Sequence, residues 1–61
     1  MKSFIDESVE ACLTTNDTNV IEGYMKLLQL CIQHTTDAQV KSALYEALEE
    51  VEEHMFSLLH L

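Results

Sequence analysis

Residues 46–54 contain five glutamates and one histidine within nine positions, the densest group of potential metal ligands in the sequence. Di-iron helical bundles bind metal through glutamate and histidine at positions i and i+3 of one helix, both facing inward. For His54 that glutamate would have to stand at position 51, which is Val51. The pair that is present, Glu50 and His54, supplies one edge of a site, and the rest of the chain offers no inward carboxylate to complete it. We therefore predict no metal site and no cofactor.

His54 falls on an apolar helical stripe, where its imidazole needs a polar partner. We expect a histidine at the edge of the core that bonds to Glu50 or to a residue across a dimer interface. The alternative is a pH-sensitive contact, because histidine is the side chain that titrates close to neutral pH. His34 and His60 stand at predicted helix ends, where a cation suits the helix dipole, so neither requires a catalytic role.

The two cysteines, Cys12 and Cys31, are expected to be free. If the first two helices pair about residues 17 and 18, the sulfurs lie roughly 12 Å apart along the axis. The Cα atoms of a disulfide lie within about 7 Å of each other. Both cysteines fall on apolar faces, which indicates buried thiols in a reducing compartment. The sequence also lacks a Gly-x-Ser-x-Gly elbow and a glycine-rich phosphate loop, so we predict that the protein is not an enzyme.

The period of the apolar residues predicts three helices, at about residues 3–15, 19–34 and 37–60. They form one small domain that spans residues 1–61. The absence of proline and the single glycine, Gly23, favour helices joined by short turns. The predicted fold is therefore all-α: a short helix followed by an antiparallel helical hairpin with a long C-terminal helix.

Side chains that cap helices precede each predicted helix. Ser3 stands before the first. Thr18 or Asn19 is expected to cap the second, and Thr36 with Gln39 matches a capping box for the third.

The second and third helices have wide apolar faces. Nearly half of the circumference of the second is apolar, so it needs more than one neighbour. Gly23 lies in its middle at a cost of about 0.5–1 kcal/mol relative to alanine, which either a close helix crossing or a tolerated defect explains. The third helix has a main seam with the spacing of a coiled coil and a second apolar stripe beside it. The main seam consists of Val40, Leu44, Ala47, Val51, His54 and Leu58.

Antiparallel pairing leaves the end of the third helix without a neighbour. With the turn near Thr35 and Thr36, Val20 faces Val51, and residues 52–61 project about 15 Å beyond the second helix. An apolar projection of this kind should not stay in contact with water. We expect a homodimer in which two hairpins form a four-helix core, with the first helix at the flank.

The charge of the chain limits its partners. Eleven acidic residues stand against three lysines, for a net charge of −8. Binding to nucleic acid or to an anionic membrane is disfavoured because both need cationic side chains, whereas a protein with a basic patch is favoured. The N-terminus has acids where a signal peptide needs an apolar core, and no apolar run approaches the roughly 20 residues of a membrane span. We expect a cytoplasmic protein.

Together these features predict a small acidic helical protein that regulates or inhibits a larger protein by binding to its surface, as a homodimer. The acidic face expected to meet the partner consists of Glu46, Glu49, Glu50 and Glu53. Apolar contacts to the partner or to the second copy are expected from Tyr45, Leu48, Met55, Phe56, Leu58 and Leu59.

Two alternative functions remain open. In the first, the acidic row imitates phosphates and blocks a DNA- or RNA-binding protein, which predicts strong salt sensitivity. In the second, the chain is a structural helical subunit of a larger assembly, which predicts that Phe56 and Leu59 matter while the glutamates do not.

Overall fold

The computed structural model describes residues 3–60. Three helices make up most of this range, and no strand occurs within it: α1 (Phe4–Leu13), α2 (Thr18–His34) and α3 (Ala38–Leu59). The prediction of an all-helical fold is confirmed. None of the described helices is both long and apolar enough to cross a membrane.

The first helix begins where the sequence predicts. The Ser3 side chain accepts a hydrogen bond of 3.2 Å from the backbone N–H of Asp6. It thereby satisfies one of the N–H groups that have no partner inside the helix.

Aspartates cap the other two helices. Asp17 and Asp37 each accept a hydrogen bond of 2.9 Å from the N–H two residues further on. The predicted caps, Thr18 or Asn19 for α2 and Thr36 for α3, were therefore wrong by one or two positions. A carboxylate suits the positive end of the helix dipole as well as the unpaired N–H groups.

Both linkers use the same local arrangement ahead of these caps. Thr15 accepts a bond of 3.1 Å from the N–H of Asp17, and Thr35 accepts one of 3.4 Å from the N–H of Asp37. A threonine followed two positions later by aspartate thus ends one helix and starts the next. Such short side-chain-to-backbone bonds favour turns over a continued helix.

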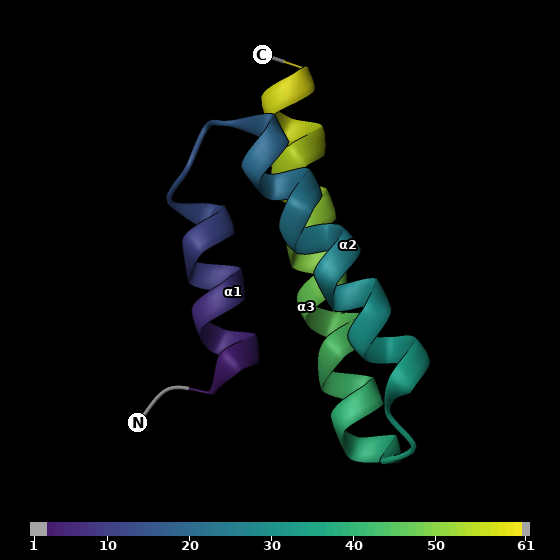
Figure 1. The fold of residues 1–61 in the computed structure, drawn as a ribbon. Helices are drawn as coiled ribbons and strands as arrows, with labels where there is room; N and C mark the ends of the chain where they lie inside the picture. Colours follow the sequence, from purple (N-terminus) through teal and green to yellow (C-terminus); the bar gives the residue numbers. More distant parts are fainter. Residues whose placement is uncertain (1–2, 61) are drawn as a thin grey trace.

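The longest helix, α3, is the central one. It packs along both other helices, whereas α1 and α2 contact each other little. Figure 1 shows α1 and α3 running in the same direction and α2 running back between the two linkers. Because α3 has neighbours on two sides, it buries a broad arc that comprises Leu44, Ala47, Leu48 and Val51. This arc explains why its sequence shows two adjacent apolar stripes.

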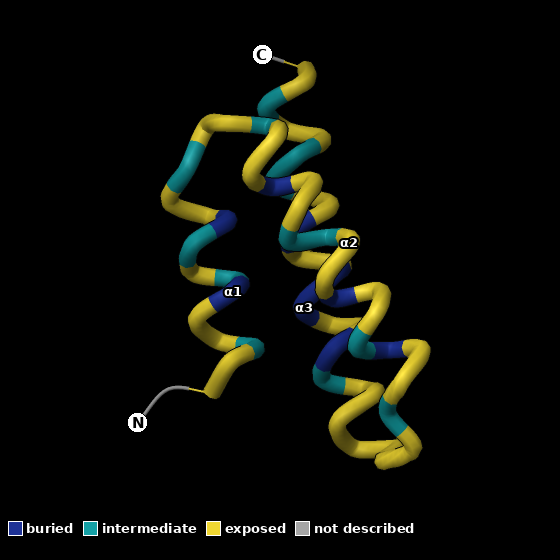
Figure 2. The backbone as a smooth tube through the Cα atoms, in the orientation of Figure 1, coloured by how far each residue is buried: buried dark blue, intermediate teal, exposed yellow. Residues whose placement is uncertain are grey.

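The buried core draws on all three helices and lies along the middle of the molecule (Figure 2). One residue of the predicted main seam differs: Val40 is 40% exposed. It lies in the first turn of α3, close to the linker from α2. The core consists of Cys12, Ile21, Leu28, Ile32, Leu44, Ala47, Leu48 and Val51.

Part of the apolar face of α2 remains open. A Cβ atom placed on Gly23 would meet no atom within 4 Å, so the explanation by a close helix crossing was wrong and a tolerated defect remains. Val20, Leu27 and Leu30 beside it are 40–52% exposed. Because α1 packs mainly on α3 and contacts α2 little, it leaves these side chains of α2 uncovered.

The last turns of α3 extend past the start of α2 (Figure 1). Met55 and Leu58 at this end are half-buried and pack against the core. Phe56 and Leu59 are 63% and 67% exposed, and Leu61 lies outside the described residues. The exposed apolar surface of this end is therefore carried by Phe56 and Leu59.

Candidate interaction surface

Four glutamates form a strip along the solvent side of α3, which we call the glutamate row: Glu46, Glu49, Glu50 and Glu53. All four are exposed and line one shallow depression. At 100° per residue they occupy an arc of about 100°, opposite the buried arc of α3. Within residues 3–60, no three histidine, cysteine, aspartate or glutamate side chains lie where they would hold one metal ion. Because its four side chains are exposed, the row presents negative charge to its surroundings.

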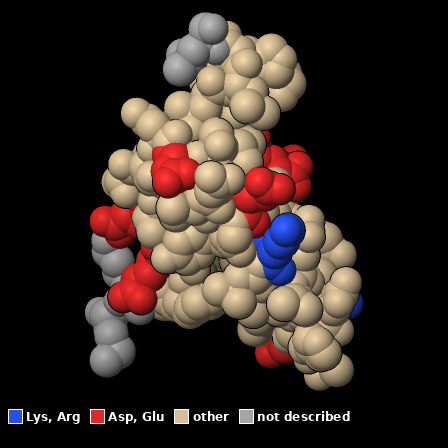
Figure 3. All heavy atoms as spheres, turned by 45° about the horizontal axis from the view of Figure 1, so that its top comes forward, with Lys and Arg blue, Asp and Glu red and all other residues tan. Residues whose placement is uncertain are grey.

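Acidic side chains also occupy parts of the surface outside the glutamate row. Figure 3 shows one face of the molecule on which acidic groups are spread widely and lysine occupies a small area. This distribution follows from the excess of acidic residues over lysines in the sequence. This face of the molecule therefore presents mainly negative charge.

Only some of the predicted apolar contact residues are free for a partner. Tyr45 is 55% exposed, and Phe56 and Leu59 are exposed to a greater extent. Leu48 is 9% exposed and belongs to the core, so its assignment as a contact residue does not agree with its position. Tyr45, Phe56 and Leu59 fall within about 60° of one another on α3, and we call them the α3 apolar stripe.

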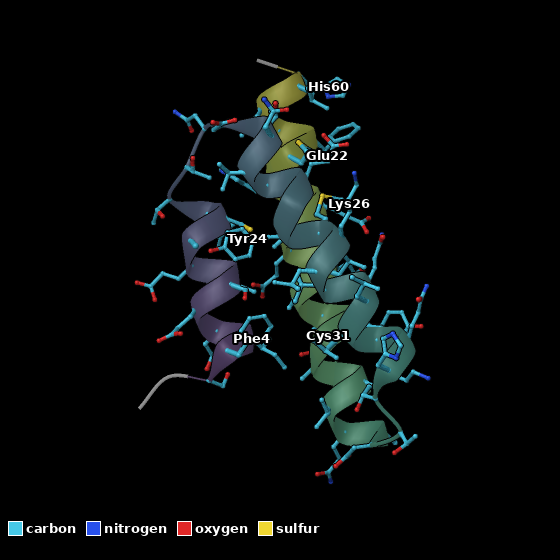
Figure 4. All side chains as sticks on the ribbon, in the orientation of Figure 1. Phe4, Glu22, Tyr24, Lys26, Cys31 and His60 are labelled. Atoms are coloured by element: carbon cyan, nitrogen blue, oxygen red, sulfur yellow. The ribbon has the colours of Figure 1, made fainter. Side chains whose placement is uncertain are left out.

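The end of the α3 apolar stripe is ordered by a local contact. The rings of Phe56 and His60 stack with centroids 3.9 Å apart and planes 25° apart. His60 Nδ1–H donates to the Phe56 carbonyl at 2.8 Å. The two rings thus lie face to face at the C-terminal end of α3, where Figure 4 labels His60.

A groove between α1 and α3 borders the glutamate row. Its floor is apolar, its rim is acidic, and Glu46 and Glu50 belong both to it and to the row. The sequence analysis did not assign Asp6, Glu10 or Ala43 to a site. The available signal was a pair of small residues four positions apart on α3, Ala43 and Ala47. The groove is lined by Ile5, Asp6, Val9, Glu10, Leu13, Thr14, Ala43, Glu46, Ala47 and Glu50.

His54 has a partner that the sequence did not predict. Its Nε2 lies 3.0 Å from the backbone carbonyl oxygen of Thr15, in the linker between α1 and α2. Because a carbonyl only accepts, Nε2–H is the donor, and both the neutral ring with that tautomer and the charged ring provide it. Neither Glu50 nor a second chain is needed to satisfy this nitrogen.

Replacing His54 with alanine is expected to lower the free energy of unfolding by about 1–2 kcal/mol, because the Thr15 carbonyl loses its donor. Urea titration followed by circular dichroism measures this loss. His34→Ala is the matched control, since His34 is exposed at the end of α2, and we expect a change within about 0.5 kcal/mol. Equal losses in both variants would contradict a role of His54 in holding the linker.

The two cysteines are free, as predicted, and differ in exposure. Cys12 is buried and Cys31 half-buried. Burial raises the pKa of the Cys12 thiol, which keeps it protonated and unreactive. Figure 4 places Cys31 on α2, well apart from the position where Tyr24 reaches from α2 toward α1. We assign no nucleophilic role to either thiol.

Comparison with known proteins gives no match: none among family models, and no significant one among curated proteins or solved structures.

Proposed function

We propose that this protein regulates or inhibits a larger protein by binding to a basic patch on its surface through the glutamate row. The observation that carries the proposal is the exposure of Glu46, Glu49, Glu50 and Glu53 on one side of α3. A strip of one sign raises the rate of encounter with an oppositely charged partner and selects against like-charged ones.

The glutamate row also carries an internal cost that a partner relieves. Glu46 with Glu50, and Glu49 with Glu53, are like-charged pairs four residues apart. Each such pair destabilises a helix by about 0.2–0.5 kcal/mol. A cationic surface placed over the row replaces this repulsion with attraction, so binding and helix stability support each other.

The protein further acts as a homodimer in which a second copy covers the α3 apolar stripe. Large apolar side chains as exposed as Phe56 and Leu59 tend to mark interaction sites. Two copies joined in this way double the number of glutamate rows, and a partner with two basic patches then gains avidity.

Mimicry of nucleic acid is a second candidate because of the axial density of the row. Glu46 to Glu53 spans about 10.5 Å, or roughly 3.5 Å per interval between its four charges, at a rise of 1.5 Å per residue. One DNA strand carries a phosphate every 3.4 Å or so along its axis. The row stops after four charges, however. Four charges are enough for docking to a basic patch, which does not need a longer strip.

Capture experiments with the chain as bait in lysate of its source cells test the proposal. The wild type is compared with Glu49→Lys/Glu53→Lys and with a control, Glu7→Lys/Glu22→Lys, whose reversed residues lie on α1 and α2. Each reversal adds two positive units to the −8, so both double variants carry −4. We expect the wild type and the control to retain the same proteins, and the row variant to lose them.

The identity and salt response of the captured proteins separate the alternatives. Mimicry would be favoured if the captured proteins bind nucleic acid and if raising the salt from about 50 to 200 mM releases them, because contacts of the phosphate type weaken steeply over this range. Retention of the same proteins by the row variant would contradict both electrostatic functions. If replacement of Phe56 and Leu59 alone then abolished capture, a structural subunit would be the better interpretation.

A further inference from the structure

The floor of the groove between α1 and α3 is apolar surface that the folded chain leaves partly open. From α1, Leu13 is 45% exposed and Val9 is half-buried. From α3, Ala43 and Ala47 contribute only methyl groups, so the space that larger side chains would fill remains empty. Covering apolar surface stabilises by roughly 25 cal/mol per Å², and an apolar occupant therefore gains free energy here.

Carboxylates stand on both rims of this floor. Asp6 and Glu10 come from α1, and Glu46 and Glu50 come from α3. None of the described residues that line the groove is lysine or arginine. The complementary occupant has an apolar side between two cationic edges, and like-charge repulsion disfavours an acidic one.

The walls of the groove select a helical occupant over an extended one. Backbone N–H and C=O groups of α1 and α3 bond within their own helices, so they offer no edge with which a strand could pair. A helix satisfies its own backbone groups and needs only a groove. Figure 1 shows α1 and α3 side by side. Ile5, Val9 and Leu13 line the groove over about 12 Å, or two helical turns.

We propose that the groove between α1 and α3 binds a cationic amphipathic helix of another protein. The apolar side of that helix lies on the floor, and its lysines or arginines meet Asp6 and Glu10 on one rim and Glu46 and Glu50 on the other. The proposal rests on the proposed function, because the α3 rim is half of the glutamate row. It adds the docking geometry and assigns the other half of the row to long-range attraction.

A synthetic peptide provides the probe for this site. It is a labelled helix of about 14 residues, four turns long, with leucines on one face and lysines on both flanks. The reference peptide has the same composition in an order that forms no apolar face. By fluorescence anisotropy we expect the wild-type chain to bind the ordered peptide at least about tenfold more tightly than the reference, since only the ordered peptide presents its leucines together.

Filling the groove tests its role directly. Ala43→Leu places a larger side chain in the floor and is expected to weaken binding of the ordered peptide by about tenfold or more, because the hollow that the alanine leaves is lost. Ala38→Leu makes the same change at an exposed position of α3 and should leave binding unchanged. Circular dichroism verifies that both variants fold.

Two charge variants test the rim without altering the floor. Glu46→Gln/Glu50→Gln removes one rim, whereas Glu49→Gln/Glu53→Gln removes the same charge from the row outside the groove. We expect the rim variant to lower the affinity for the ordered peptide about tenfold more than Glu49→Gln/Glu53→Gln does, because charge-assisted contacts act at short range.

The outcomes separate this proposal from the proposed function. If the ordered and reference peptides bind equally, or if both charge variants lose the same affinity while Ala43→Leu loses none, charge alone accounts for binding. That result overturns the groove and leaves the function of the row intact. If neither peptide binds, the groove proposal is also overturned. The capture experiment in lysate still decides the proposed function, because its row variant reverses only Glu49 and Glu53.

Discussion

Leu28→Ala is expected to lower the free energy of unfolding by about 2–5 kcal/mol, the usual cost of a cavity in a core. Leu28 is completely buried in the cluster that unites the three helices. A chain of 61 residues typically has only about 3–9 kcal/mol in total, at 0.05–0.15 kcal/mol per residue. We therefore expect this variant to lose a large share of its stability and to unfold at a much lower urea concentration, which far-UV circular dichroism in a urea titration measures.

Leu30→Ala is the control for this prediction. It makes the same change two residues away on the same helix, at a side chain that is 52% exposed, so the gain in helix propensity is equal in both variants. We expect a change within about 0.5 kcal/mol. Similar urea midpoints for the two variants, at the same protein concentration, would show that Leu28 does not occupy the core.

The second large effect is expected on association. Phe56→Gln/Leu59→Gln should convert a homodimer into a monomer of 7.0 kDa at micromolar concentration, as measured by size exclusion with light scattering. Each apolar side chain removed from an interface costs about 1.5–3 kcal/mol, and symmetry removes it from both copies. The dissociation constant should therefore rise at least about 100-fold.

The monomer should stay folded, because both side chains are more than 60% exposed within one chain. Val20→Gln/Leu30→Gln serves as the control on the open face of α2 and should remain dimeric. Monomerisation by the control but not by the Phe56 variant would place the interface on α2 instead. A wild-type chain that is already monomeric at micromolar concentration would refute the homodimer.

Local features of the fold were predictable because they depend on neighbours in sequence. Ser3 caps α1 as predicted, since the residue that it bonds is three positions away. The predicted caps of α2 and α3 missed Asp17 and Asp37, because several adjacent residues in each linker have suitable side chains and their sequence alone does not rank them.

The candidate surface was predictable only in part. The glutamate row follows from the helical period of α3, so the sequence could predict its exposure opposite the core. The bond between His54 and Thr15 joins residues 39 positions apart, and no local pattern encodes it. The role of Asp6 and Glu10 as one rim of a groove depends equally on α1 lying against α3.

The sequence alone predicts an all-helical, strongly acidic chain whose last helix carries charge along one side. These properties follow from the period of side chains along a helix and from a count of ionisable groups. Three features depend instead on how the helices pack: the central position of α3, the burial of Leu48, and the open groove across which two alanines face α1. Packing partners are selected by shape and contact between distant segments, and the period of one helix does not specify these.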